Sequence, residues 1–170
     1  MKKALIIIDM QNDFVTGALA NVDAQKIVSP IAKFASDYDG DIILTRDTHG
    51  DSYLMTQEGE KLPIRHCVRG TPGHDVVKEI RDACSAKKSR YIDKCTFGFH
   101  DKTIWDLGEY DEVDVVGTCT DICVVSNVLI LKSLYPSLTI RVHDNLCAGL
   151  TPEKHAAAIE VMKSCQAEVV

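Results

Sequence analysis

A cysteine that follows a tight turn between an apolar run and a helical pattern is the strongest chemical signal in the sequence. Residues 113–116 (VDVV) are mostly apolar and typical of a short buried parallel strand, and GTCTDICVV (residues 117–125) follows them directly. A helical spacing begins at Ile122 and places Cys123 near the first turn of a helix. Backbone N–H groups are unpaired there and the local field is positive, which favours a thiolate over a thiol. The pattern predicts that Cys123 is a nucleophile; the alternative is a buried structural cysteine.

A carboxylate and an ammonium group occupy similar positions elsewhere in the chain. Asp9 directly follows the apolar run 4–8, and Lys94 directly follows the short run 90–93. Each has an ordinary alternative, because Asp9 could cap a turn and Lys94 could be one more solvated lysine. Asp9 is the more telling of the two, since a charge that abuts a fully apolar strand needs a partner.

The elements that must position these residues alternate between strands and helices. A helix is expected over residues 24–38 with Asp23 as its N-cap, and another is expected to begin at the Thr151-Pro152-Glu153 signal. The other expected helices span residues 75–86 and 122–134, and the expected strands span residues 4–8, 41–45, 90–93, 113–116, 138–142 and 167–170. This alternation predicts an α/β fold, a parallel sheet with helices on both faces, and one domain over residues 1–170.

That architecture brings the three reactive groups together. In open parallel sheets the working site lies at the carboxyl ends of the strands, near the point where the strand order reverses. Cys123 would attack a carbonyl carbon, Asp9 would take the thiol proton and return it to the leaving amine, and Lys94 would hold the charges in register. Backbone N–H groups at Cys119 and Cys123 would stabilise the oxyanion.

Composition restricts the partners. The chain has 170 residues and a net charge of −6, which argues against nucleic acid and anionic membranes as partners because both need clustered Lys and Arg. No apolar run approaches a membrane span, and no signal peptide is evident, so a cytoplasmic location is expected. The seven cysteines lack C-x-x-C spacing and are expected to be free thiols. A small-molecule amide is the expected partner, and the formation of a homo-oligomer stays open.

Three motifs in order resemble the isochorismatase-like cysteine hydrolases, with the nicotinamidase/pyrazinamidase branch nearest. They are DMQNDF (residues 9–14), Lys94 after a strand, and GTCTDICV (residues 117–124). The resemblance runs from residue 3 to about residue 142. It implies a three-layer α/β/α sandwich on a six-stranded, mostly parallel sheet, and an Asp9–Lys94–Cys123 triad. It also implies a non-proline cis peptide at the Cys119 turn that helps to form the oxyanion hole.

The same resemblance implies a metal site. Read alone, Asp47, His49 and His66 in loops are more often solvated polar residues than ligands. Nicotinamidases place a metal on an Asp-x-His pair and on the His of a His-Cys-Val-x-Gly-Thr stretch, which these residues match. Glu58 is the expected further ligand, with Glu60 as its alternative. One divalent transition metal is expected, Zn²⁺ foremost with Fe²⁺ and Mn²⁺ as alternatives, and it would orient the pyridine nitrogen of the substrate.

The chain departs from the family pattern around the substrate. Many nicotinamidases have Trp at the position of Thr48, and they commonly have Thr at the position of Asn127. The aromatic residues left as candidates for substrate contact are Phe14, Phe97 and Phe99, with ordinary loop packing as the alternative for Phe97 and Phe99. These departures leave the triad intact and the identity of the amide open.

The leading hypothesis is an amidohydrolase that cleaves nicotinamide, or a close aromatic amide, to the acid and ammonia through a Cys123 thioester. The alternative is a cysteine hydrolase of the same fold that acts on a carbamoyl, ureido or other small amide, a group that generally lacks the metal loop. Isochorismatase activity is disfavoured because it does not use a cysteine nucleophile. A non-catalytic nucleotide- or flavin-binding module is disfavoured because no G-x-G-x-x-G or P-loop motif occurs. A catalytically inactive scaffold also stays open.

Overall fold

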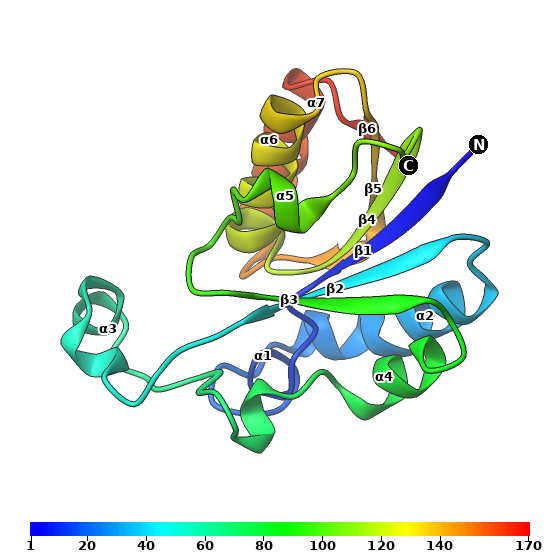
Figure 1. Cartoon of the computed structure of the whole chain (residues 1–170). Helices are drawn as coiled ribbons and strands as arrows, with labels where there is room; N and C mark the ends of the chain where they lie inside the picture. The colour runs from blue at the N-terminus through cyan, green and yellow to red at the C-terminus, as the bar shows by residue number, and fades with distance from the viewer.

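A six-stranded, all-parallel sheet in the order β3-β2-β1-β4-β5-β6 lies between two layers of helices (Figure 1). The computed structural model describes residues 1–170. The strands are β1 Lys3–Ile8, β2 Asp41–Asp47, β3 Ser89–Lys94, β4 Glu112–Thr118, β5 Thr139–Ala148 and β6 Glu168–Val169. The expected three-layer α/β/α class and six-stranded sheet are confirmed.

The helices are mostly short. They are α1 Asn12–Val15, α2 Val22–Asp37, α3 Gln57–Lys61, α4 Lys78–Cys84, α5 Lys102–Trp105, α6 Val125–Leu134 and α7 Pro152–Ser164. Two 3₁₀ turns, Tyr53–Met55 and Pro72–His74, flank the long loop after β2, and a π-helical turn, Thr120–Val124, precedes α6. None of the helices has the length and apolar character that crossing a lipid bilayer requires.

The apolar runs of the sequence are explained by a core on each face of the sheet. Helices α2 and α4 cover one face, and α5, α6 and α7 cover the other (Figure 1). In β1, Ala4, Ile6 and Ile8 pack into one core while Leu5 and Ile7 pack into the other. The strand is therefore apolar at every position, as expected for a central parallel strand buried on both faces.

The strand order reverses between β1 and β4, which are neighbours in the sheet although about a hundred residues separate them in the chain. From β1 the chain builds outward through β2 to β3, and it then returns to β4 and builds outward through β5 to β6 on the other side. A crevice outside the carboxyl ends of the strands is expected at this point. Asp9 follows β1 there, and the turn that contains Cys119 follows β4.

Several boundaries differ from those expected from the sequence. The N-cap of α2 is Asn21 rather than Asp23, because the Asn21 side chain accepts hydrogen bonds from the backbone N–H groups of residues 23 and 24. Strand β5 continues to Ala148, beyond the expected end at residue 142, because its pairing with β4 resumes after an irregularity at Gly117. The expected sixth strand is present but is only two residues long.

The end of β4 depends on Gly117. Its φ is +124°, a conformation that side chains rarely adopt, and an added Cβ would lie 2.2 Å from the carbonyl oxygen of Ile8 on β1. The absence of a side chain lets the two central strands stay paired up to the point where the site begins.

We therefore expect Gly117→Ala to lower the free energy of unfolding by about 2–4 kcal/mol, since strain and overlap act together. Gly108→Ala is the matched control, because nothing lies within 4 Å of a Cβ at Gly108. Urea unfolding of both variants measures the difference. Equal stability of the two variants would contradict this account of the β1–β4 contact.

Candidate active site

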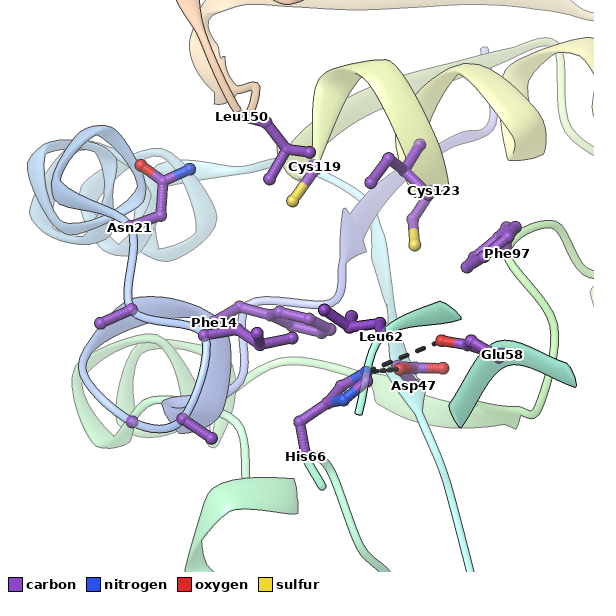
Figure 2. Close-up of a pocket in the computed structure, with 15 residues that line it drawn as sticks. Phe14, Asn21, Asp47, Glu58, Leu62, His66, Phe97, Cys119, Cys123 and Leu150 are labelled. Atoms are coloured by element: carbon purple, nitrogen blue, oxygen red, sulfur yellow. Dashed lines mark ion pairs between the residues drawn. The ribbon is translucent and has the colours of Figure 1, made fainter. Parts of the chain in front are cut away.

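A cavity of about 490 Å³ opens at the carboxyl edge of the sheet (Figure 2). Most of its lining is apolar. The acidic and imidazole side chains of Asp47, Glu58 and His66 lie together at one end, and the side chains of Cys119 and Cys123 point into the cavity from the turn after β4 (Figure 2). The cavity therefore combines an apolar body with a small number of convergent polar groups, as ligand sites commonly do.

A buried ion pair underlies the cavity. Lys94 Nζ lies 2.6 Å from Asp9 Oδ2, and neither side chain has any exposed area. The Thr45 hydroxyl donates to Asp9 Oδ1 at 2.6 Å, whereas Oδ2 has no partner besides the Lys94 ammonium. Lys94 Nζ also lies 3.2 Å from the carbonyl oxygen of Thr96 and 3.6 Å from Cys123 Sγ. The expected trio is thus brought together by the ends of β1, β3 and β4.

The charges of this pair follow from burial and proximity. Burial by itself would lower the pKa of Lys94, but the neighbouring Asp9, Cys123 and Asp47 groups outweigh it, and the pKa is raised. Lys94 is therefore a cation. Burial raises the pKa of Asp9 although Lys94 acts in the opposite direction. The Asp9 carboxylate consequently binds a proton more readily than an exposed aspartate does.

Cys123 lies in the π-helical turn, which follows a cis peptide between Thr118 and Cys119. The cis bond expected from the resemblance is confirmed. The expectation that the helix field would favour a thiolate does not hold for the free protein. Burial, reinforced by the charge and hydrogen bonding of Asp9, raises the pKa of the Cys123 thiol well above its ordinary value of 9.0, and Lys94 compensates only in part.

Asp47, His49 and His66 form a cluster whose ligand atoms all lie within 4.8 Å of one another. Asp47 Oδ2 is 2.9 Å from His49 Nε2 and 3.4 Å from His66 Nε2. His66 Nδ1 lies 2.8 Å from the Ile64 carbonyl oxygen, to which it can only donate, so Nε2 is left free to act as a ligand. One carboxylate and two imidazoles in this arrangement suit a divalent transition metal.

Glu58, rather than Glu60, reaches this cluster. Glu58 Oε1 lies 3.7 Å from His49 Nε2 and 3.8 Å from His66 Nε2, whereas Glu60 is exposed. Both residues lie on α3, whose N-terminus is capped by the Thr56 side chain. The helix therefore turns one of its two acidic side chains towards the site.

Gln11 supports the cluster, although the sequence analysis did not single it out. Its side-chain Nε2 donates to the carbonyl oxygens of Asp47 and His74, each at 2.9 Å, and its Oε1 accepts from the Asp47 N–H at 2.7 Å. Thr45 was missed in the same way. The available signals were a polar residue inside DMQNDF and a hydroxyl in the apolar strand β2, but their partners lie in segments that are distant in the sequence.

The aromatic residues separate into two groups. Phe14 and Phe97 line the cavity, but Phe99 does not. The Phe99 ring packs edge-on against Trp105 with ring centroids 6.0 Å apart, and its carbonyl oxygen accepts a hydrogen bond from the Trp105 indole. Phe99 thus contributes to the core under α5 rather than to the cavity wall.

Comparison with known proteins covers nearly the whole chain. A model of the isochorismatase domain matches residues 3–170. A nicotinamidase/pyrazinamidase from Mycobacterium tuberculosis is 32% identical over 99% of this chain and 98% of its own length. A nicotinamidase structure from Bacillus subtilis superposes with a TM-score of 0.87 at 28% identity, covering 100% of this chain and 99% of that one. A pyrazinamidase from Pyrococcus horikoshii in complex with zinc gives a TM-score of 0.82 at 25% identity, with 100% and 99% coverage. The resemblance drawn from the motifs is confirmed.

The raised pKa of Cys123 predicts its labelling behaviour. In the resting protein the thiol is protonated at neutral pH, so alkylation by iodoacetamide should be slow at pH 7 and should accelerate as the pH rises beyond 9.0. Asp9→Asn removes a charge that raises this pKa, and labelling at pH 7 should become faster by about tenfold or more. Peptide mass spectrometry reads each cysteine separately.

The exposed Cys95 and Cys165 serve as internal controls in the same samples. A Cys123 that labels at pH 7 as fast as these two, or that is unaffected by Asp9→Asn, would contradict the assigned electrostatics.

Proposed function

This chain belongs to the isochorismatase family, and from that premise we propose that it hydrolyses nicotinamide, or a close aromatic carboxamide, to the acid and ammonia. The observation that carries the proposal is the convergence of Asp9, Lys94 and Cys123 beside one cavity that also holds a ligand cluster. We take residues 1–170 as one catalytic domain with Cys123 as its nucleophile.

The first half of the reaction forms a thioester. The Cys123 thiol passes its proton to Asp9 Oδ2, the oxygen whose only partner is the Lys94 ammonium, while the sulfur attacks the carboxamide carbon. Backbone N–H groups of Cys119 and Cys123 stabilise the oxyanion. Asp9 then gives the proton to the departing nitrogen, and ammonia leaves. Lys94 remains a cation throughout and compensates the negative charge as it moves between sulfur and carboxylate.

The second half regenerates the thiol. Asp9 accepts a proton from water as the water oxygen attacks the thioester carbon, and the sulfur leaves and recovers a proton. The sum is one amide and one water converted to one carboxylic acid and one ammonia. The raised pKa of Asp9 suits this repeated exchange, because an ordinary aspartate would hold a proton too weakly.

Asp47, His49, His66 and Glu58 are the residues that would hold a divalent metal, and Zn²⁺ is the proposed ion, with Fe²⁺ and Mn²⁺ as alternatives. The zinc complex of the Pyrococcus horikoshii pyrazinamidase supports this choice. When bound, the metal supplies a Lewis acid for the lone pair of a heterocyclic nitrogen and thereby orients the substrate. Phe14 and Phe97 flank the space in which the ring would lie.

Ammonia release from nicotinamide tests the proposal. We expect the zinc-loaded protein to release ammonia and nicotinate in equal amounts, and Cys123→Ala to lower kcat by at least about 10³-fold, because the nucleophile is lost. Cys95→Ala is the control for general thiol loss. Activity on ureido or aliphatic amides with none on nicotinamide would reject the substrate, and full activity of Cys123→Ala would reject the mechanism.

Metal content tests the ligand set. After chelation and titration with Zn²⁺, the wild type should bind one ion per chain, and His66→Ala should bind none at the same free concentration. Glu58→Gln should weaken binding by about tenfold or more, while Glu60→Gln, its matched control on α3, should bind as the wild type does. Equal affinity in the Glu58 and Glu60 variants would remove Glu58 from the ligand set.

A further inference from the structure

The loop between β3 and α5 lies directly against α6, the helix that follows the nucleophile turn. A Cβ added at Gly98 would lie 2.5 Å from Ile130 Cδ1 and 3.1 Å from Ser126 Cβ, both on α6. The loop therefore approaches the helix closely enough that only a glycine fits there without displacement. Phe97 and Phe99 lie on either side of this contact, and only Phe97 lines the cavity.

Asn127 ties this loop to the nucleophile turn. Its side-chain Nδ2 donates to the Cys123 carbonyl oxygen at 2.7 Å and to the Phe97 carbonyl oxygen at 3.1 Å. Its Oδ1 accepts from the Phe99 N–H at 2.9 Å. The side chain is fully buried, so every bond that it gives up would leave a polar group without water. One amide thus holds both the backbone of the nucleophile and the backbone of the loop.

Phe97 is the residue of this loop that lines the cavity. Its side chain is half exposed, and its ring stands beside the Cys123 side chain at the polar end of the cavity (Figure 2). Ile122 and Leu62, which also line the cavity, are aliphatic. The position of the Phe97 ring therefore sets how much space is available beside the sulfur, and Asn127 and Gly98 set the position of Phe97.

We propose that Asn127 is a positioning residue that fixes Phe97 relative to Cys123 and thereby makes the site selective for flat, aromatic acyl groups. The proposal rests on the proposed amide hydrolysis. Asn127 does not touch the reacting atoms, so it acts through Phe97. Its loss should weaken binding of a ring more than it slows the chemical steps, because the side chains of Asp9, Lys94 and Cys123 keep the contacts that they make with one another and with Thr45.

A double-mutant cycle with nicotinamide tests this coupling. We expect Asn127→Ala to raise KM by about tenfold and to lower kcat by no more than about threefold, since a displaced wall costs binding. When Asn127→Ala is added to Phe97→Ala, KM should stay within about twofold of the value for Phe97→Ala alone, because the side chain that Asn127 positions is already gone. An equal rise of KM in both backgrounds, or no rise in either, overturns the proposal.

Val128→Ala is the matched control, because Val128 is an equally buried neighbour on α6 that makes no hydrogen bond to the loop. It should lower stability without changing KM. If Asn127→Ala does not fold, Gly98→Ala replaces it in the cycle. The added Cβ displaces the loop from α6, and the Asn127 side chain is retained. We expect Gly98→Ala to raise KM by the same factor, and we expect no such rise when Phe97→Ala is already present.

Competitive inhibition by benzamide and cyclohexanecarboxamide, a flat and a puckered ring of similar size, tests the selectivity. The wild type should bind benzamide more tightly, and Asn127→Ala should reduce the ratio of the two inhibition constants by at least about threefold. An unchanged ratio overturns the proposal. A wild type that releases no ammonia from nicotinamide would instead reject the proposed function, so the two failures are distinguishable.

Discussion

Burying an aspartate and a lysine at the ends of two parallel strands is costly, because both charges lose their water. The cost is offset only while the two remain together, at 2.6 Å from Asp9 Oδ2 to Lys94 Nζ. Removing one partner would leave the other charged and unpaired, a loss of about 3–5 kcal/mol in comparable cases. This pair determines the rest of the site. Thr45 donates to one oxygen of Asp9 and Lys94 pairs with the other, and this second oxygen is the one that accepts the proton of the Cys123 thiol in the proposed mechanism.

The ligand cluster and the acid–base groups are linked electrostatically. Asp47 contributes Oδ2 to the cluster, and its Oδ1 lies 3.9 Å from Lys94 Nζ. Burial would raise the pKa of Asp47, but hydrogen bonds from His49 and His66 and the charge of Lys94 outweigh it and hold the pKa below its usual range. Asp47 is therefore an anion that faces both halves of the site, and Gln11 fixes its backbone. We therefore expect metal binding at the ligand cluster to change the pKa values of the acid–base groups.

The sequence predicted the site residues that lie at the ends of strands, and it missed the contacts that join segments distant in the sequence. Asp9, Lys94 and Cys123 could be found because each lies at or just beyond the end of its own strand, and parallel strands place these ends on one edge. Thr45, Gln11 and the loop contacts of Asn127 join segments that are far apart in the sequence, and no spacing shows which partner they face. The position of Cys123 near a helix N-terminus predicted a thiolate, but burial and the neighbouring Asp9 raise the pKa of the thiol instead. Phe97 and Phe99 look alike in sequence, and only the packing of Gly98 on α6 separates them.

The central claim is that the thiol of Cys123 carries the acyl group. Mixing the metal-loaded protein with excess nicotinamide, quenching with acid within the first turnovers and analysing the peptides by mass spectrometry tests it directly. The account predicts a nicotinoyl adduct on the peptide that contains Cys123, on no other cysteine, and its decay as substrate is exhausted. Ammonia released at full rate with no adduct on Cys123 at any quench time would contradict it.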